Sequence, residues 1–554
     1  MNRLGSIRWR VIALALLGVA PACGAKAAEQ SDIVASLQHI ARTGRGLPLT
    51  VSPEERGRLE RLYQASGYSL MWLNPSGKPR RVGTDALERV RGAATEGLRP
   101  ADYGVGRIDS LIRLAGERSQ DAALVARADA GISAALLRFL DHLHVGRVSP
   151  RRAGFSIDRP RERHDYVELL LDGWRRSDIA GVVEGLAPEL TQYRLARQAL
   201  ARWRARSDSA EPPLRLPVPL EPNRPADPEQ LRNLARRLQR TGDLARIPPN
   251  PARYEGELVA AVQRLQGRMG LPSEGVIGAE TLGELNTSSA TRVRQLELAL
   301  ERLRWVSDLP NEPLVMVNIP MFELTVWNSP YLPGPPVFRT GVIVGKALDT
   351  QTPIIVEEMR YLVFQPYWNV PPSIAANEIL PALDRDPHYL VKNNMEIVEG
   401  QSDGESVVPA TGGALDGVAT GRLRIRQRPG PWNSLGPVKF MFPNAHNVYL
   451  HGTPAQQLFD RTRRDFSHGC VRVEDPTGLA EWVLREKPGW DRSRIEDAML
   501  DGSRVSYHVS LPRPLTVVLF YSTAFVEEDG TVRFARDIYG HDRRLEAALG
   551  KLKG

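Results

Sequence analysis

The chain has 554 residues, of which 25% are charged and 42% are hydrophobic, a composition typical of a folded protein of two to four domains. The formal net charge is +8, but four of the positive charges lie in the first 27 residues, so the remainder is only weakly basic. A nucleic-acid-binding protein would carry a denser basic patch, and we therefore predict no nucleic-acid partner.

The N-terminus has the layout of a secretory signal. Arginines precede an unbroken apolar run at Val11–Ala20, and Ala25-Lys26-Ala27 supplies the small residues of a cleavage site. The apolar run is about half the length that a membrane-spanning helix needs. We predict a signal peptide at 1–27 and an exported chain. An uncleaved leader that tethers the chain to the membrane, and a lipid on Cys23, are the alternatives.

Residues 31–206 are predicted to be mostly helical, because their apolar residues recur at spacings of three and four, as at Leu59, Leu62 and Tyr63. No catalytic set clusters in this region, which indicates a helical scaffold. Seven prolines lie between Glu211 and Pro228, and neither a helix nor a central strand accepts such a run. The sequence therefore predicts a stiff, extended linker at 207–228.

A small three-helix module is predicted at 229–288. Its second helix carries a stripe of apolar residues that ends at Met269 and is followed by Gly270, a typical helix-ending residue. From about Leu314 the apolar period changes to two, which predicts a β domain at 310–525. Residues 526–554 form a C-terminal extension.

The β domain is interrupted at 366–430, which we predict to be an inserted lid. Helix-forming residues dominate 368–390. Six glycines fall within 399–421, and this stretch is expected to be a loop without one stiff conformation. The predicted fold class is multidomain α+β.

Cys470 is the only cysteine outside the leader, so removal of the leader excludes an intramolecular disulfide. His468 lies two residues before it, and His451 ends a predicted strand. A neighbouring imidazole that takes up the thiol proton makes a cysteine a nucleophile. The amides of Gly469 and Cys470 could face a developing oxyanion, and Arg472 could hold a carboxylate.

Two other interpretations of the same residues remain open at this point. His451, His468 and Cys470 are acceptable zinc ligands, although no fourth ligand is evident. An inert buried cysteine is also common, but a free thiol in an exported protein is prone to oxidation unless it is used or shielded.

The segment from His451 to Arg472, with SHGCVR at 467–472, resembles the signature of the L,D-transpeptidase (YkuD-type) catalytic domain. The surrounding sequence agrees with the large periplasmic members of that family. The stretches that carry the resemblance are YWNVPPSI at 367–374, RQRPGPWNSLGPVKF at 426–440, FPNAHNVYLHGTP at 442–454, a peptidoglycan-binding-like segment at 261–286, and the scaffold-like segments GYSLMWLNPSGKP at 67–79 and HVGRVSP at 144–150.

The resemblance implies a role for each matching residue. Cys470 matches the nucleophile, His451 the general base, and Gly452 the residue whose backbone carbonyl orients that base. Neither a metal nor an organic cofactor is implied. The substrate-binding and site-shaping positions are Ser467, His468, Gly469 and Arg472.

Two aromatic residues are further candidates for the substrate groove. Tyr449 lies two residues before His451 on the same strand and therefore on the same face. Trp368 lies where the β domain is interrupted by its insertion. We expect both to line the groove that binds the donor.

The implied function is an L,D-transpeptidase that forms 3→3 peptidoglycan cross-links through a cysteine thioester on a tetrapeptide stem. Its partners would be donor and acceptor stem peptides, its location the periplasm, and carbapenems its inhibitors. Hydrolysis (an L,D-carboxypeptidase), exchange with a D-amino acid and anchoring of a lipoprotein are alternatives through the same acyl-enzyme. A non-catalytic wall-binding protein is a further alternative.

Overall fold

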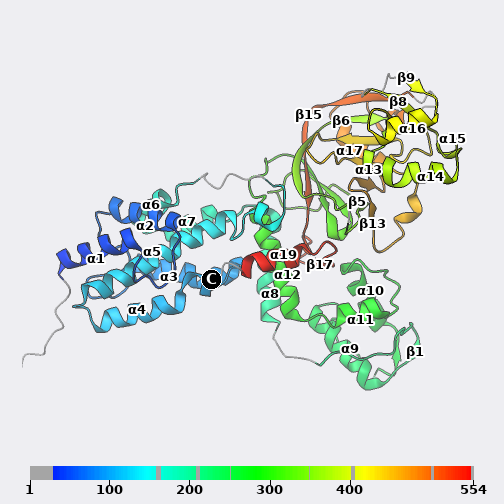
Figure 1. The fold of residues 1–554 in the computed structure, drawn as a ribbon. Coiled ribbons are helices and arrows are strands. Elements are labelled where there is room, and N and C mark those ends of the chain that lie inside the picture. Colours follow the sequence, from blue (N-terminus) through cyan, green and yellow to red (C-terminus); the bar gives the residue numbers. More distant parts are fainter. Residues whose placement is uncertain are drawn as a thin grey trace, which may run out of the picture. The chain divides into compact units, whose positions relative to one another are not determined.

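The computed structural model describes residues 29–157, 164–206, 212–249, 251–348, 350–400, 406–500 and 505–550. Helices dominate the first half and strands the second, so the multidomain α+β prediction is confirmed (Figure 1). The predicted leader at 1–27 lies outside the described residues. Within the described ranges, no helix has both the length and the apolar composition to cross a membrane.

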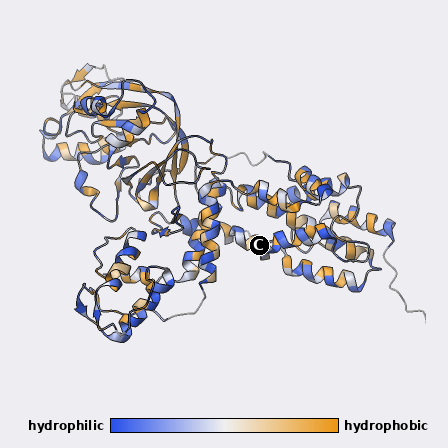
Figure 2. Ribbon diagram, turned by 180° about the vertical axis from the view of Figure 1, so that it is seen from behind, coloured by the Kyte–Doolittle hydropathy of each residue, from blue (hydrophilic) through white to orange (hydrophobic). Residues whose placement is uncertain are grey.

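The chain divides into two compact units. The first consists of 1–88, 103–137 and 167–180, and the second of the remaining residues. The helices visible in Figure 2 carry both hydrophobic and hydrophilic residues, as amphipathic helices that pack on one side require. The helices before the module are α1 (Gln30–Thr43), α2 (Pro53–Ala65), α3 (Arg81–Arg91), α4 (Val105–Glu117), α5 (Ala122–Val145), α6 (Tyr166–Arg176), α7 (Ile179–Leu186) and α8 (Thr191–Ala205).

A buried carboxylate organises the first unit. Asp129 on α5 accepts hydrogen bonds from the Tyr63 hydroxyl, at 2.6 Å, and from the amides of Met71, Trp72 and Leu73. Burial raises the pKa of Asp129, and these bonds oppose the shift. The contact fixes part of the scaffold-like segment 67–79 to α5.

The small module has the three predicted helices, α9 (Pro228–Thr241), α10 (Glu257–Arg268) and α11 (Ala279–Leu285). The proline-rich segment, predicted as a stiff, extended linker, is attached to this module over residues 212–225. Leu220 is buried and exchanges backbone hydrogen bonds with Ile277, at 3.1 and 3.0 Å. Strands β1 (Arg224–Pro225) and β2 (Arg253–Tyr254) pair just after it. Residues 212–225 therefore pack on the module.

The β domain is one nine-stranded sheet that closes on itself, because β4 pairs with both β3 and β5. The strand order is β13-β5-β14-β12-β11-β6-β15-β3-β4. Helices α12 (Ser289–Arg304), α17 (Pro476–Leu484) and α18 (Arg492–Leu500) accompany it. The strands are β3 (Leu314–Asn318), β4 (Glu323–Trp327), β5 (Phe338–Gly345), β6 (Ile355–Phe364), β11 (Val438–Met441), β12 (Leu450–His451), β13 (Asp465–Ser467), β14 (Val471–Val473) and β15 (Tyr507–Phe520).

The insertion is a folded subdomain with its own sheet of order β7-β10-β8-β9. The strands are β7 (Trp368–Asn369), β8 (Met395–Glu399), β9 (Ser406–Val408) and β10 (Arg424–Gln427). The helical segments are α13 (Pro372–Ile374), a π-helical turn (Ala375–Ile379), α14 (Leu380–Arg385), α15 (Tyr389–Lys392) and α16 (Gly412–Ala419). Ile379, Ile397 and Ile425 belong to a separate hydrophobic core.

The expectation of a shapeless loop at 399–421 is wrong over its described part. Strand β9 pairs with β8, and α16 buries Ala414 and Val418 against the small core. Burial of these two side chains favours the helix, although Gly412 and Gly413 begin it and helix propensity is low there. Residues 401–405 lie outside the described part.

The C-terminal extension packs on the same unit. Strands β16 (Ala524–Val526) and β17 (Val532–Phe534) form a hairpin, and α19 (His541–Gly550) follows. Arg302 of α12 makes a buried 2.6 Å ion pair with Asp542 of α19.

Candidate active site

A cavity of about 700 Å³ lies between the β domain and the insertion. Strands β11, β12 and β14 supply one wall, the segment before β12 another, and the insertion a third. Seven of the nine site residues expected from the sequence line this cavity, and Gly452 and Gly469 adjoin them in the chain. The seven are Trp368, Tyr449, His451, Ser467, His468, Cys470 and Arg472.

His451 is buried at the end of β12, and its Nδ1 lies 2.5 Å from the carbonyl oxygen of Gly452. A carbonyl only accepts hydrogen bonds, so Nδ1 must carry the proton and Nε2 keeps its lone pair. Burial lowers the pKa of His451 to about 3, and Arg472 contributes in the same direction. The imidazole is therefore neutral in the resting site, with Nε2 able to accept a proton.

The strand register brings Cys470 into the same cavity as this imidazole. His451 pairs with Arg472 across β12 and β14, and Val471 donates its amide to the carbonyl of Tyr449 at 3.1 Å. Cys470 directly precedes β14, and its side chain lines the same cavity as those of Arg472 and His451. Burial raises the pKa of the Cys470 thiol, whereas hydrogen bonds from Tyr449 act against the shift. The cavity therefore holds a neutral thiol and a neutral imidazole at rest.

The turn that presents the thiol is fixed by hydrogen bonds. The Ser467 hydroxyl donates to the carbonyl of Cys470 at 2.5 Å and accepts the amide of Gly469 at 3.2 Å. Gly469 has a φ of +118°, which a residue with a side chain rarely adopts. Its carbonyl accepts from Thr352 at 2.8 Å. The expectation that the Gly469 amide faces an oxyanion is therefore wrong, because Ser467 occupies it, and the amide of Cys470 is the remaining candidate.

His468 points toward the insertion. Its Nε2 lies 2.7 Å from Oε1 of Glu378, and about one third of the His468 side chain is exposed. Glu378 lies in the π-helical turn of the insertion. Sequence analysis missed Glu378, which is 90 residues from His468, and no local pattern marks it.

Lys439 is a second residue that sequence analysis missed. It lies in β11 directly opposite His451 and lines the cavity. Its Nζ is 5.4 Å from the centroid of the Tyr449 ring, a cation–π contact. The Tyr449 ring in turn lies 5.7 Å from the His451 ring. The only sequence signal for Lys439 was its position within 426–440, one of the stretches that carry the family resemblance.

The aromatic candidate Trp368 is half-buried on the insertion side. It lies in β7, where it pairs with Gln427 of β10. Across the described ranges, no group of three or more histidine, cysteine or acidic residues is arranged to hold a metal ion.

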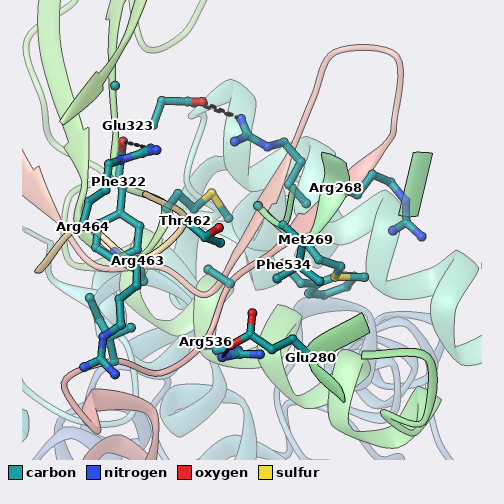
Figure 3. Close-up of a pocket in the computed structure, with 18 of the residues that line it drawn as sticks. Arg268, Met269, Glu280, Phe322, Glu323, Thr462, Arg463, Arg464, Phe534 and Arg536 are labelled. Atoms are coloured by element: carbon teal, nitrogen blue, oxygen red, sulfur yellow. Dashed lines mark hydrogen bonds and ion pairs between the residues drawn. The ribbon is translucent and has the colours of Figure 1, made fainter. Parts of the chain in front are cut away.

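A second cavity, of about 630 Å³, lies between the small module, the β domain and β17 (Figure 3). Many of its arginines are engaged in ion pairs or hydrogen bonds. Arg536 pairs with Glu280 at 2.9 Å, Arg268 pairs with Asp243, and Arg464 donates to the carbonyl of Phe322 at 2.9 Å. The described residues that line it include neither cysteine nor histidine.

Three segments of the chain match known protein families. Residues 312–505 match the L,D-transpeptidase catalytic domain. Residues 57–200 match a family described as "Scaffold domain", and residues 227–285 match one described as "Putative peptidoglycan binding domain".

Individual proteins are similar over part of the chain. A "Putative L,D-transpeptidase" of Haemophilus influenzae is 33% identical over 266 residues, which are 47% of this chain and 51% of that protein. The chain thus spans about half the length of this curated relative. The crystal structure of an L,D-transpeptidase (residues 123–326) from Xylanimonas cellulosilytica matches 56% of this chain and all of that chain at 13% identity. Its TM-score is 0.16, which carries no argument about the fold.

The domain matches and the relative agree with the site that the geometry describes. The chain thus contains an L,D-transpeptidase catalytic domain at 312–505, together with a scaffold domain and a peptidoglycan-binding domain.

Proposed function

We propose that the chain forms 3→3 peptidoglycan cross-links by acyl transfer through Cys470. The observation that carries this proposal is that the Cys470 thiol and a neutral His451 line the same cavity. Because Nδ1 of His451 is held by the carbonyl of Gly452 at 2.5 Å, Nε2 is the proton acceptor. Such a pair suits acyl transfer by a cysteine nucleophile.

In the first half-reaction the thiol proton passes to Nε2 of His451, and the sulfur attacks the carbonyl of the diamino acid in a tetrapeptide stem. The oxyanion that forms accepts a hydrogen bond from the amide of Cys470. The imidazolium then protonates the leaving amine, and the bond to the terminal D-alanine breaks. The products are a thioester on Cys470 and free D-alanine.

In the second half-reaction the side-chain amine of another stem attacks the thioester. His451 removes a proton from the attacking amine, the carbon–sulfur bond breaks, and the sulfur leaves as a thiolate that recovers the proton. The new amide bond is the cross-link. Water or a D-amino acid at the same position would give hydrolysis or exchange, and a lysine of a lipoprotein would give anchoring.

We assign the insertion the role of a lid that keeps water from the thioester. Three observations support this assignment. The insertion is a folded body with its own core, its Trp368 and Ile374 line the cavity, and its Glu378 contacts His468. Exclusion of water favours an amine acceptor over hydrolysis.

We also propose a periplasmic location, because the stem peptides lie outside the cytoplasm and the sequence begins with a predicted leader. The leader is either removed or kept as a tether. The peptidoglycan-binding domain at 227–285 supports a polymeric peptidoglycan substrate.

Incubation of the full chain with purified wall fragments, followed by mass analysis, tests this function. We expect products linked between two diamino acids, with release of D-alanine. A matched Cys470→Ser preparation should give none. Trimmed products would indicate hydrolysis and exchanged products would indicate D-amino-acid exchange, in place of cross-linking. Unchanged fragments would contradict the proposed function.

A further inference from the structure

Lys439, His451 and Arg472 form one row across three adjacent strands. Lys439 of β11 pairs with His451 of β12, and His451 pairs with Arg472 of β14. Directly paired residues project from the same face of a sheet, and neighbouring strands lie about 4.8 Å apart. Two cations therefore flank the catalytic imidazole, with their backbones roughly 10 Å apart.

Both cations face the cavity of Cys470. Lys439, Arg472 and Arg424 line it, whereas its described lining contains no aspartate or glutamate. The cation–π contact with Tyr449, at 5.4 Å, holds the ammonium of Lys439 beside the ring that lies next to His451. This charge distribution suits a ligand with more than one negative group.

The donor supplies carboxylates at a matching separation. The carboxylate of the terminal residue lies about 4 Å from the scissile carbonyl. A diamino acid with a carboxylate at the far end of its side chain places a second one about 7 Å away in another direction. Two carboxylates on opposite sides of the scissile carbonyl thus span a distance similar to the backbone spacing of Lys439 and Arg472, and the two side chains can adjust to it.

We propose that Lys439 is a specificity-determining residue that binds the far carboxylate of the diamino acid, while Arg472 holds the carboxylate of the terminal residue. The preferred donor is then a stem whose diamino acid is a dicarboxylic acid. A stem with lysine at that place lacks this group. The inference rests on the proposed acyl transfer and specifies its donor.

Donor binding has a consequence for the base. Arg472 and Lys439 both contribute to the low pKa of His451. A carboxylate bound to each of them offsets their positive charge and favours a protonated imidazole. A dicarboxylic donor would therefore strengthen the base that its own reaction needs.

The test compares two synthetic tetrapeptides that differ only in the third residue, meso-diaminopimelate or L-lysine. Acylation of the full chain is followed by intact-protein mass, and the ratio of the two kcat/KM values is the readout. Both donors are assayed with the same enzyme, so an effect of a variant on Cys470 or His451 changes both kcat/KM values alike and cancels in the ratio. The ratio therefore reports recognition of the far carboxylate. The variants are Lys439→Gln and the charge-conserving Lys439→Arg.

We expect wild type to favour the diaminopimelate donor by about tenfold or more, as for one charge-assisted contact. Lys439→Gln should reduce the ratio to about one, and Lys439→Arg should restore much of it. Equal use of both donors by wild type would overturn the inference and leave the proposed function standing. An undiminished ratio in Lys439→Gln would overturn it as well. If neither donor acylated a wild-type chain whose thiol reacts with iodoacetamide, the proposed function would fail and the inference with it.

Discussion

Glu378 and His468 make a side-chain hydrogen bond of 2.7 Å that joins the inserted subdomain to the turn carrying Cys470. His468 is two residues from Cys470, and Glu378 belongs to a segment whose core is separate from that of the β domain. Because both side chains are partly exposed, the pair contributes little to overall stability. It is well placed, however, to couple the position of the insertion to the site.

The first prediction concerns this pair. Glu378→Gln should weaken the contact and let water reach the thioester more often, so the ratio of hydrolysed to cross-linked product should rise. Mass analysis of the products measures the ratio. Asp384→Asn, which removes an exposed carboxylate from the same subdomain, is the matched control. An unchanged ratio in Glu378→Gln would remove the pair from lid closure.

The second prediction separates the two histidines of the site. Cys470→Ser should abolish acyl transfer, because a hydroxyl is a far weaker nucleophile than a thiol. His451→Ala should reduce the rate by about two to four orders of magnitude, the contribution of general acid–base catalysis. His468→Ala should cost less, because its Nε2 faces Glu378. If His468→Ala proved the more damaging, His451 would not be the base.

The third prediction uses the raised pKa of Cys470. Burial raises the pKa of Cys470 because it disfavours the charged thiolate. A hydrogen bond from the Tyr449 hydroxyl stabilises the thiolate and lowers the pKa. Tyr449→Phe removes the donor, so the pKa of Cys470 should rise further. Alkylation by iodoacetamide should then need a higher pH than in wild type. A pH profile of alkylation measures the shift, and a profile that moved to lower pH would contradict the hydrogen bond.

The fourth prediction concerns the donor groove. Trp368→Ala should raise the KM for the donor, because the half-buried indole lines the cavity on the insertion side. Its effect on kcat should be smaller than that of His451→Ala. Phe466→Ala, a change of an exposed aromatic residue near the turn, is the control. Unchanged kinetics would remove Trp368 from donor binding.

The spacing of the apolar residues predicted the order of the helical and β segments. The SHGC motif and the histidine at a fixed distance before it identified Cys470 and His451 as candidate catalytic residues. These signals are local in the chain. Lys439 could not be assigned in this way, because its relation to His451 depends on the register between β11 and β12. Glu378 meets His468 only through the fold of the insertion.

The glycine-rich part of the insertion was misjudged for a related reason. Glycine propensity favours a loop, but burial of Ala414 and Val418 stabilises α16. The proline-rich segment shows the same effect, since buried Leu214 and Leu220 attach it to the module. In both cases tertiary packing, which no local pattern reports, outweighs local preference.

In the proposed function, Cys470 forms a thioester with a tetrapeptide stem. Intact-protein mass after brief exposure to the diaminopimelate tetrapeptide tests it most directly. The account predicts a mass increase equal to the tetrapeptide minus D-alanine, confined to Cys470 on peptide mapping and absent from Cys470→Ser. A carbapenem should give its own adduct at the same residue. An unchanged mass with both reagents, on a protein whose thiol is shown to be reduced, would contradict the account.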